Sequence, residues 1–298
     1  MISILIPTYN FNTLPLVQEL HKQILVENIK FEIIVQDDAS PINENTKINS
    51  KINQLEYCRF ERNETNLGRG QNRNALVTKA QYDWILLMDC DMFPKSKNFI
   101  KIYLKSIQKE DRKAVFGGII YFDEKPKDDD VLRWIFGKNR EEIPLKKRLT
   151  NPYHYTLISN ILVQKKWVMD HPFDQNIYNY GYEDVVFILG FKSNDIPITH
   201  IENPAFHLNL EKSKVFLDKT HHSLLNLKHI IDKKIIEPND TALIKMYTRI
   251  EKLKLVKTVA FIFKIFRKSI IKNLLSKNPS IFLFDVYRLG YFCQLNSR

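Results

Sequence analysis

Two aspartates, Asp89 and Asp91, stand directly after the apolar run 85–88, with only Cys90 between them. Side chains alternate along an extended chain, so both carboxylates are expected on one side while Cys90 points away. Two like charges at that spacing favour a cation beside them, and hard divalent cations take carboxylate oxygens together with a ligand's phosphates. The pattern therefore predicts a divalent metal site that serves a phosphorylated ligand. The alternative is a pair of turn-forming aspartates after a strand.

A second acidic pair, Glu183 and Asp184, precedes the apolar residues Val185, Val186 and Leu189. That spacing predicts a helix whose first turn holds both acids. The positive end of a helix stabilises an ionised carboxylate, so either acid is a candidate base at neutral pH. The alternative is a favourable charge at a helix start that carries no chemistry.

Alternating strand-like and helix-like segments must position these acids. Regular alternation indicates an α/β fold with a mostly parallel sheet flanked by helices, and such sheets bind ligands at the carboxyl ends of their strands. The expected strands are 3–6, 31–36, 57–61, 84–88 and 114–121, and the expected helices are 14–26, 45–55, 70–80 and 97–108.

Polar segments follow four of these strands. They read "PTYN" at 7–10, "QDDAS" at 36–40, "NETNLGRGQNRNA" at 63–75 and "DCD" at 89–91. Because the carboxyl ends of parallel strands meet at one edge of a sheet, these segments are expected to converge on a single ligand site.

The strings "ILIPTYN", "IIVQDDAS", "NLGRGQNRN" and "LLMDCDMF", in this order and spacing, resemble the nucleotide-sugar-binding half of family 2 glycosyltransferases. These enzymes have the Rossmann-like GT-A fold, and the resemblance is to the bacterial type that builds polysaccharides. With "YNYGYEDVVF", which is similar to the family's acceptor motif, the resemblance covers about the first 210 residues. Two features depart from the family pattern: Ala39 stands where glycine is common, and "DCD" is shorter than the usual acidic run. Neither departure removes a charged ligand.

The resemblance implies roles for residues around the donor's base. Pro7 and Tyr9 would pack around the base, and Asp38 would accept a hydrogen bond from the uracil imide. For Tyr9 the alternative is ordinary core packing.

The resemblance also implies a diphosphate and metal site. Arg73 would lie near the base and diphosphate, Asp89 would face the ribose or the metal, and Asp91 would hold the metal itself. His207 would complete the metal site, and its nitrogen suits Mn²⁺ as well as Mg²⁺. The alternatives are a surface ion pair for Arg73 and a structural histidine for His207.

For the second acidic pair, the resemblance implies that Asp184 removes the proton from the acceptor hydroxyl and that Glu183 binds or orients the acceptor. The expected activity is therefore a metal-dependent, inverting glycosyltransferase of the hexosyltransferase type. It would move a sugar from a uridine diphosphate-linked donor to a hydroxyl of a glycan or a lipid-linked glycan.

Composition limits the class of protein. A hydrophobic content of 44% with 12% aromatic residues in 298 residues excludes a disordered chain. Three widely spaced cysteines indicate neither a disulfide framework nor a zinc site, and a reducing compartment fits them best. The start of the chain lacks the basic region of a signal peptide, so a cytoplasmic location is expected.

The positive charge is concentrated near the end of the chain. Residues 245–298 hold twelve Lys and Arg against two acids, a net of +10, whereas the remaining 244 residues have a net of +1. Within 256–275, Val259, Phe263, Phe266, Ile270 and Leu274 recur at helical spacing. Opposite them stand Lys257, Lys264, Lys268 and Lys272. This basic amphipathic helix predicts peripheral contact with an anionic membrane at the inner face of the cell membrane. The alternative is a helix packed on the body with its lysines in solvent.

These observations predict a GT-A domain at 1–212 and a basic helical extension at 213–298. The GT-A domain would comprise a nucleotide-sugar-binding half at 1–122 and an acceptor half at 123–212. A second class of function is a non-catalytic binding protein whose basic tail contacts nucleic acid. Because the tail contains no recognised nucleic-acid module, no nucleic-acid partner is expected.

Overall fold

A computed structural model describes residues 1–109, 113–177 and 180–297, without the side chain of Asp128. Contacts divide the chain into two compact units. The sheet unit comprises Met1–Tyr121, Glu142–Tyr178 and Glu183–Asn209, and the helical unit comprises Phe122–Glu141, Asn179–Tyr182 and Leu210–Arg298. The predicted domain boundary after residue 212 remains a prediction.

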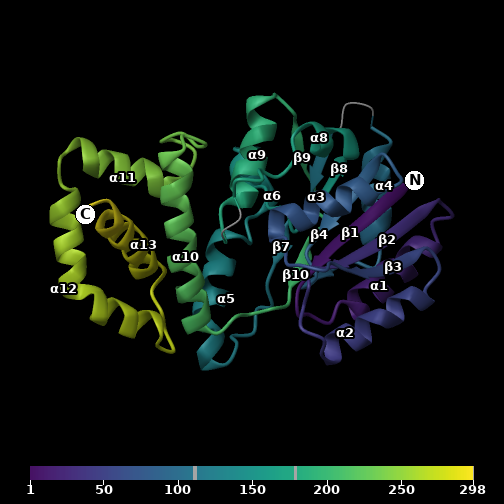
Figure 1. Cartoon of the computed structure of the whole chain (residues 1–298), viewed down its shortest axis with the longest axis horizontal. Coiled ribbons are helices and arrows are strands. Elements are labelled where there is room, and N and C mark those ends of the chain that lie inside the picture. Colours follow the sequence, from purple (N-terminus) through teal and green to yellow (C-terminus); the bar gives the residue numbers. More distant parts are fainter. Residues whose placement is uncertain (110–112, 178–179, 298) are drawn as a thin grey trace. The chain divides into compact units, whose positions relative to one another are not determined.

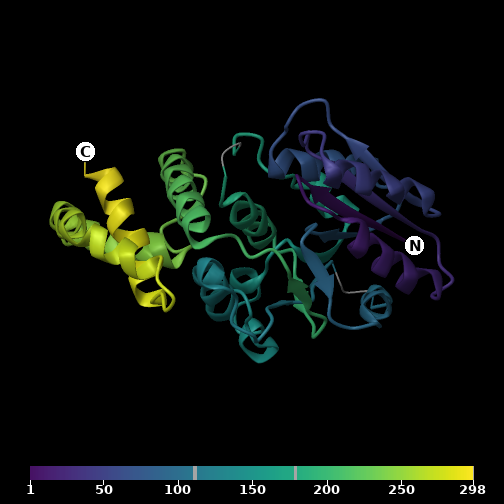
Figure 2. The same cartoon turned by 90° about the horizontal axis from the view of Figure 1, so that it is seen from below.

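A seven-stranded sheet in the order β3-β2-β1-β4-β8-β6-β9 forms the centre of the sheet unit (Figure 1 and Figure 2). The first four neighbours run parallel, β8 is antiparallel to both β4 and β6, and β9 is parallel to β6. The strands are β1 (Ile2–Thr8), β2 (Phe31–Asp37), β3 (Cys58–Arg62), β4 (Trp84–Met88), β6 (Ala114–Phe116), β8 (Asn160–Gln164) and β9 (Ile198–His200).

The central strands are buried because helices cover both faces of the sheet. Every residue of β2 is buried, and so is every residue of β1 except Pro7, which is half-buried. Strands that are apolar on both sides are typical of parallel sheets of this kind. The helices of this unit are α1 (Leu14–Leu25), α2 (Glu44–Asn49), α3 (Arg69–Lys79), α4 (Phe99–Ile107), α6 (Leu145–Arg148), α7 (Pro152–Tyr155), α8 (Lys165–Asp170) and α9 (Glu183–Ser193). The predicted mostly parallel α/β fold is confirmed.

A small second sheet lies beside the first in the order β5-β10-β7. Its strands are β5 (Met92–Pro94), β10 (Ala205–His207) and β7 (Ile119–Ile120). β5 and β10 are antiparallel, with Met92 opposite His207. This pairing joins the segment after "DCD" to a segment more than a hundred residues later in the chain.

Two predicted elements are divided in the structure. The expected strand 114–121 breaks into β6 and β7 because Gly118 has a φ of +99°, which an extended strand does not accommodate. The Asn160 side chain secures the break by donating a hydrogen bond of 2.8 Å to the Gly118 carbonyl. The expected helix 45–55 becomes α2 followed by a 3-10 turn at Ser50–Gln54.

The helical unit is built from α5 (Val131–Arg140), α10 (Ser213–Asp232), α11 (Ala242–Lys252), α12 (Val256–Leu274) and α13 (Ile281–Asn296). Phe136 contacts Phe216 and Phe284 at ring distances of 5.3 and 5.5 Å, which joins α5, α10 and α13. No helix among the described residues is long and apolar enough to cross a membrane.

The predicted helix near the end of the chain is confirmed as α12, but most of the apolar face that was expected to contact a membrane is buried against α13, as the alternative of a packed helix predicted. Phe263, Ile270 and Leu274 are buried, whereas Phe266 is 56% exposed. The buried face packs on α13, so Phe266 lies outside the sector that α13 covers.

Candidate functional site

The two aspartates of "DCD" lie in a turn. β4 ends at Met88, and the Met92 amide donates to the Asp89 carbonyl over 3.1 Å, which reverses the chain into β5. The expected strand thus ends at residue 88, but the extended conformation assumed for Asp89–Asp91 is wrong. The two aspartates lie in a turn, as the alternative predicted, because the chain must reverse for β5 to pair with β10. The turn gives Asp89 and Asp91 different partners.

Asp89 forms a close ion pair with Arg73 of α3, with 2.6 Å between Oδ1 and Nη2. Burial by itself raises the pKa of Asp89, but the Arg73 and Arg69 guanidinium groups outweigh it and hold that pKa below its ordinary value. Arg73 is buried and lies over the Phe173 ring at 5.6 Å, so the predicted alternative of a surface ion pair is wrong. Its Nη1 atom is buried without a hydrogen-bond partner among the described residues.

Asp91 faces His207 across the small sheet. The Asp91 Oδ2 and His207 Nε2 atoms are 3.6 Å apart, and both side chains are mostly buried. The Leu208 amide donates to the Asp91 carbonyl over 2.8 Å, and the Tyr121 ring stacks on His207 at 5.4 Å. The pairing of β5 with β10 thus brings together two residues that the sequence separates by 116 positions.

These two side chains fit a divalent cation in part. A carboxylate oxygen and an imidazole nitrogen suit Mn²⁺ or Mg²⁺. Within the described part of the chain, no three or more His, Cys, Asp or Glu residues gather closely enough to hold an ion. The protein would therefore supply Asp91 and His207 while phosphates and water complete the shell, as Mg²⁺ sites commonly do. Asp89 is paired with Arg73 instead, and its role at a metal remains a prediction.

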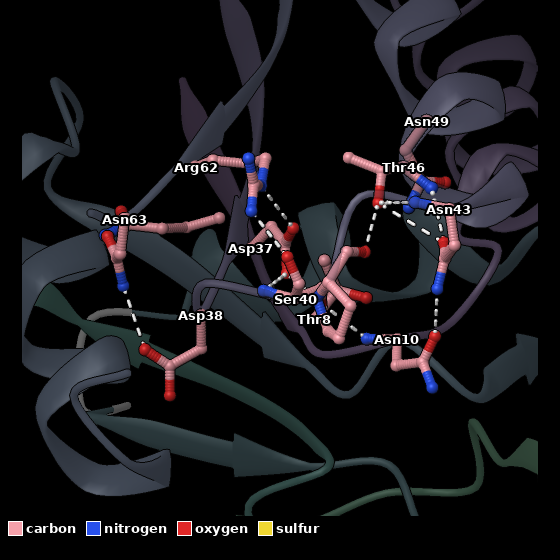
Figure 3. A network of polar contacts seen from close by, with 12 residues as sticks. Thr8, Asn10, Asp37, Asp38, Ser40, Asn43, Thr46, Asn49, Arg62 and Asn63 are labelled. Carbon is pink, nitrogen blue, oxygen red and sulfur yellow. Dashed lines mark hydrogen bonds and ion pairs between the residues drawn. The ribbon is translucent and has the colours of Figure 1, made fainter. Parts of the chain in front are cut away.

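Asp38 holds the loop that leads into α3. Its carboxylate accepts hydrogen bonds from the backbone amides of Leu67 (2.7 Å) and Gly68 (2.9 Å). It also accepts one from the Asn63 side chain (3.0 Å) (Figure 3). A carboxylate has about four acceptor positions, so one remains for a ligand. The predicted contact with a base is compatible with this geometry and remains a prediction.

The preceding turn is built on Asp37. The Asp37 carboxylate accepts from the Ser40 hydroxyl and pairs with Arg62 at 3.2 Å (Figure 3). Between Asp37 and Ser40 in the chain, Ala39 has a φ of +60°, a left-handed conformation that costs an alanine roughly 1–2 kcal/mol. The turn in which the family commonly has glycine is thus left-handed here, with an alanine bearing the strain.

Pro7 and Tyr9 lie at the end of β1. Pro7 is half-buried, while Tyr9 is 54% exposed, so the alternative of core packing for Tyr9 is wrong. The neighbouring Asn10 amide donates to Ser40 Oγ over 2.7 Å, which ties the end of β1 to the turn after β2. The exposed aromatic ring of Tyr9 suits stacking on a flat ligand.

The acidic pair opens α9 as predicted. Glu183 is buried, its Oε2 has no hydrogen-bond partner among the described residues, and its Oε1 lies 3.9 Å from Arg69 Nη1. Burial, followed by the charge of Glu183, raises the pKa of Asp184 to about 6. The Val185 amide, Arg73 and Arg69 act in the opposite direction but do not cancel that rise. From the sequence we expected the helix start to stabilise the ionised carboxylate. In the structure, burial has the larger effect on the pKa of Asp184 and raises it.

Two residues of this region escaped the sequence analysis. Arg69 stands four residues before Arg73 on α3, so the two guanidinium groups share one helix face, and that i,i+4 spacing was a usable signal. Phe173 lies under Arg73 and exchanges two hydrogen bonds with the Asn74 side chain, at 2.8 and 3.0 Å. No local sequence pattern indicates a role for Phe173, because its partners Arg73 and Asn74 are about a hundred residues away in the chain.

Comparison with known proteins agrees with this architecture. The family model "Glycosyl transferase family 2" matches residues 3–171. Hyaluronan synthase of Pasteurella multocida is 25% identical over 186 residues, which are 53% of this chain and 19% of that protein. The chain thus spans about a fifth of the length of this relative.

Solved structures share the fold. Residues 1–349 of TarS from S. aureus superpose with a TM-score of 0.51 at 19% identity, over 76% of this chain and 65% of that one. Glucosyl-3-phosphoglycerate synthase from Mycobacterium tuberculosis gives 0.50 at 16% identity, over 76% of this chain and 78% of that one. The class of protein is therefore a glycosyltransferase with the GT-A fold. The chain belongs to glycosyl transferase family 2.

Proposed function

We propose that this chain is a metal-dependent, inverting glycosyltransferase that moves a sugar from a uridine diphosphate-linked donor to a hydroxyl of a glycan. The observation that carries the proposal is the position of the acidic pair Glu183 and Asp184 at the start of α9, where Arg69 Nη1 lies 3.9 Å from Glu183 Oε1 and the pKa of Asp184 is raised. A proton acceptor suits the attacking acceptor hydroxyl. The two nearby arginine cations, Arg69 and Arg73, suit the leaving diphosphate.

Leaving-group stabilisation is assigned to α3. The diphosphate gains negative charge as the glycosidic bond breaks, and prepositioned cations stabilise that charge. Arg73 offers the buried Nη1 atom that has no hydrogen-bond partner among the described residues, and Arg69 is partly exposed. A divalent cation held by Asp91 and His207 would add Lewis-acid stabilisation of the same phosphates. Asp89 keeps Arg73 oriented through their ion pair.

Base catalysis is assigned to Asp184. In the proposed step, the acceptor oxygen attacks the anomeric carbon from the face opposite the diphosphate, and the carbon–oxygen bond to the diphosphate breaks. The hydroxyl proton passes to the Asp184 carboxylate, and the configuration at the anomeric carbon inverts. A pKa of about 6 leaves Asp184 largely ionised at neutral pH yet closer to the operating pH than an ordinary aspartate, which favours general-base catalysis. Glu183 would then orient the acceptor.

Donor selection is assigned to Pro7, Tyr9 and Asp38. The exposed Tyr9 ring suits stacking on a base, and the remaining acceptor position of Asp38 suits a uracil imide. The glucosyl-3-phosphoglycerate synthase that shares the fold is described in complex with Mn²⁺ and uridine diphosphate. One matching relative is a hyaluronan synthase, which supports a growing glycan, free or lipid-linked, as the acceptor.

Calorimetry of the whole chain with nucleoside diphosphates, each with and without Mn²⁺, tests the donor assignment, and hydrolysis of a panel of nucleotide sugars then identifies the sugar. We expect uridine diphosphate to bind only with the cation, and adenosine diphosphate to bind much more weakly. Equal binding of every nucleoside diphosphate would reject the proposed nucleobase site at Pro7, Tyr9 and Asp38. Binding of DNA or RNA without a response to any nucleotide would favour a non-catalytic nucleic-acid protein, which no observation supports so far.

A further inference from the structure

The helix α12 has one side that is fully used inside the helical unit. Phe263 contacts the Tyr287 ring edge-on at 5.7 Å, and α12 lies along α13 (Figure 1). Gly290 permits this close approach, because a Cβ atom there would collide with the Phe263 ring. Ile270 and Leu274 are buried on the same side. This side cannot insert into a partner without separating the two helices.

The opposite side of α12 is apolar and uncovered. Phe261 is 65% exposed and Ile265 58% exposed, and Ile262 and Phe266 beside them are about half exposed. The spacing of four residues stacks Phe261 with Ile265 and Ile262 with Phe266, so they form two adjoining rows along the helix. Contiguous exposed apolar side chains of this size mark an interaction surface.

A strip of lysines borders these rows. Lys257, Lys264, Lys268 and Lys272 are all exposed, and none of them forms an ion pair with a residue that the structure describes. Helix α12 contains no acid. The two acids of residues 245–298 are engaged elsewhere, since Asp285 pairs with Arg140 at 2.5 Å and Glu251 accepts from Tyr247 over 3.1 Å. The positive charge of the strip is thus uncompensated.

We propose that this outer face of α12, made of the four apolar residues and the four lysines, docks on an anionic phospholipid bilayer. A helix with an apolar strip beside a basic strip lies in the plane of the interface, with its apolar side chains below the headgroups and its lysines against their phosphates. α12 is too polar to span a bilayer, which agrees with an in-plane position. A second copy of the chain suits the face less well, because two such lysine strips repel and the rest of the chain, at a net of +1, offers little acidic complement.

Vesicle flotation of the full chain tests the docking, with phosphatidylcholine alone compared with phosphatidylcholine containing phosphatidylglycerol. The first variant carries Phe261→Ser and Ile265→Ser, and the second carries Lys264→Glu and Lys268→Glu. The control carries Val26→Ser and Ile42→Ser, which remove exposed apolar side chains from the sheet unit. All six positions are exposed, so these substitutions leave the core intact.

We expect wild type and the control to float with the anionic vesicles only, and less at high salt. The serine variant should bind about tenfold more weakly at any salt, and the glutamate variant about a hundredfold more weakly at low salt. Unchanged flotation of either variant, equal flotation with both lipids, or none by wild type would overturn the proposal. A dimer in sedimentation velocity that the serine variant loses, without vesicle binding, would assign the face to a second copy instead. None of these outcomes depends on the proposed transferase activity, because only binding is measured.

Discussion

The site contains two acidic pairs of similar composition in opposite electrostatic surroundings. Asp89 sits against Arg73, so its pKa is lowered despite burial, whereas burial and then the charge of Glu183 raise the pKa of Asp184 to about 6. Environments that push carboxyl pKa values apart separate a permanently charged group from a proton acceptor. Under the proposed function, the lowered pKa suits a charged group at the edge of the sheet, and the raised pKa suits a proton acceptor at the start of α9.

The largest effect is expected when a carboxylate of the pair after β4 is removed. Asp91→Asn should abolish both transfer and metal-dependent nucleotide binding, because the amide cannot supply the anionic oxygen beside His207. Isothermal titration with uridine diphosphate and Mn²⁺ measures the loss, and circular dichroism checks the fold. Asp170→Asn, at an exposed aspartate of α8, serves as the matched control and should bind normally. Undiminished metal-dependent binding by Asp91→Asn would remove this residue from the site.

The next largest effect is expected when the proposed proton acceptor at the start of α9 is removed. Asp184→Asn should lose about 10²-fold or more in kcat while its donor affinity stays near that of wild type, because only the transition state uses the base. Steady-state kinetics together with donor calorimetry separate these two quantities. Turnover close to wild type would move the base to another residue, with Glu183 as the first candidate.

The smallest effect concerns the turn after β2, which lies at the same edge of the sheet as the end of β4. Ala39→Gly should stabilise the protein by up to about 1 kcal/mol, because glycine relieves the left-handed strain at φ +60° but adds freedom to the unfolded chain. Urea unfolding followed by fluorescence measures the change. Ala75→Gly, within α3, is the matched control and should destabilise by about the same amount. If both substitutions destabilise equally, Ala39 bears no strain.

The sequence predicted the elements whose signal is local. The four parallel strands, the helices between them and the acidic start of α9 follow from apolar runs and their spacing. It did not predict the turn at Asp89–Asp91, because that turn is imposed by the pairing of β5 with β10. Nor did it indicate that the Asp38 carboxylate binds the loop before α3, since two of its three partners are backbone amides that any residue would supply.

Contacts with a distant segment also explain why the buried side of α12 was predicted only in part. Helical spacing correctly identified a helix with several apolar residues, but apolar residues surround most of it. The packing of α12 against α13, where Gly290 leaves room for the Phe263 ring, decides which of them are buried. Sequence periodicity therefore predicted the helix and could not predict which side remained uncovered.

The pH dependence of kcat tests the central claim most directly, because the claim is that Asp184 is a proton acceptor tuned by its neighbours. We expect kcat to fall as the pH drops through about 6, where Asp184 becomes protonated. Glu183→Gln should move this limb to lower pH because a nearby negative charge is removed, and Arg69→Gln should move it to higher pH because a nearby positive charge is removed. A kcat that is flat across this range in wild type, or a limb that neither variant moves, would contradict the account.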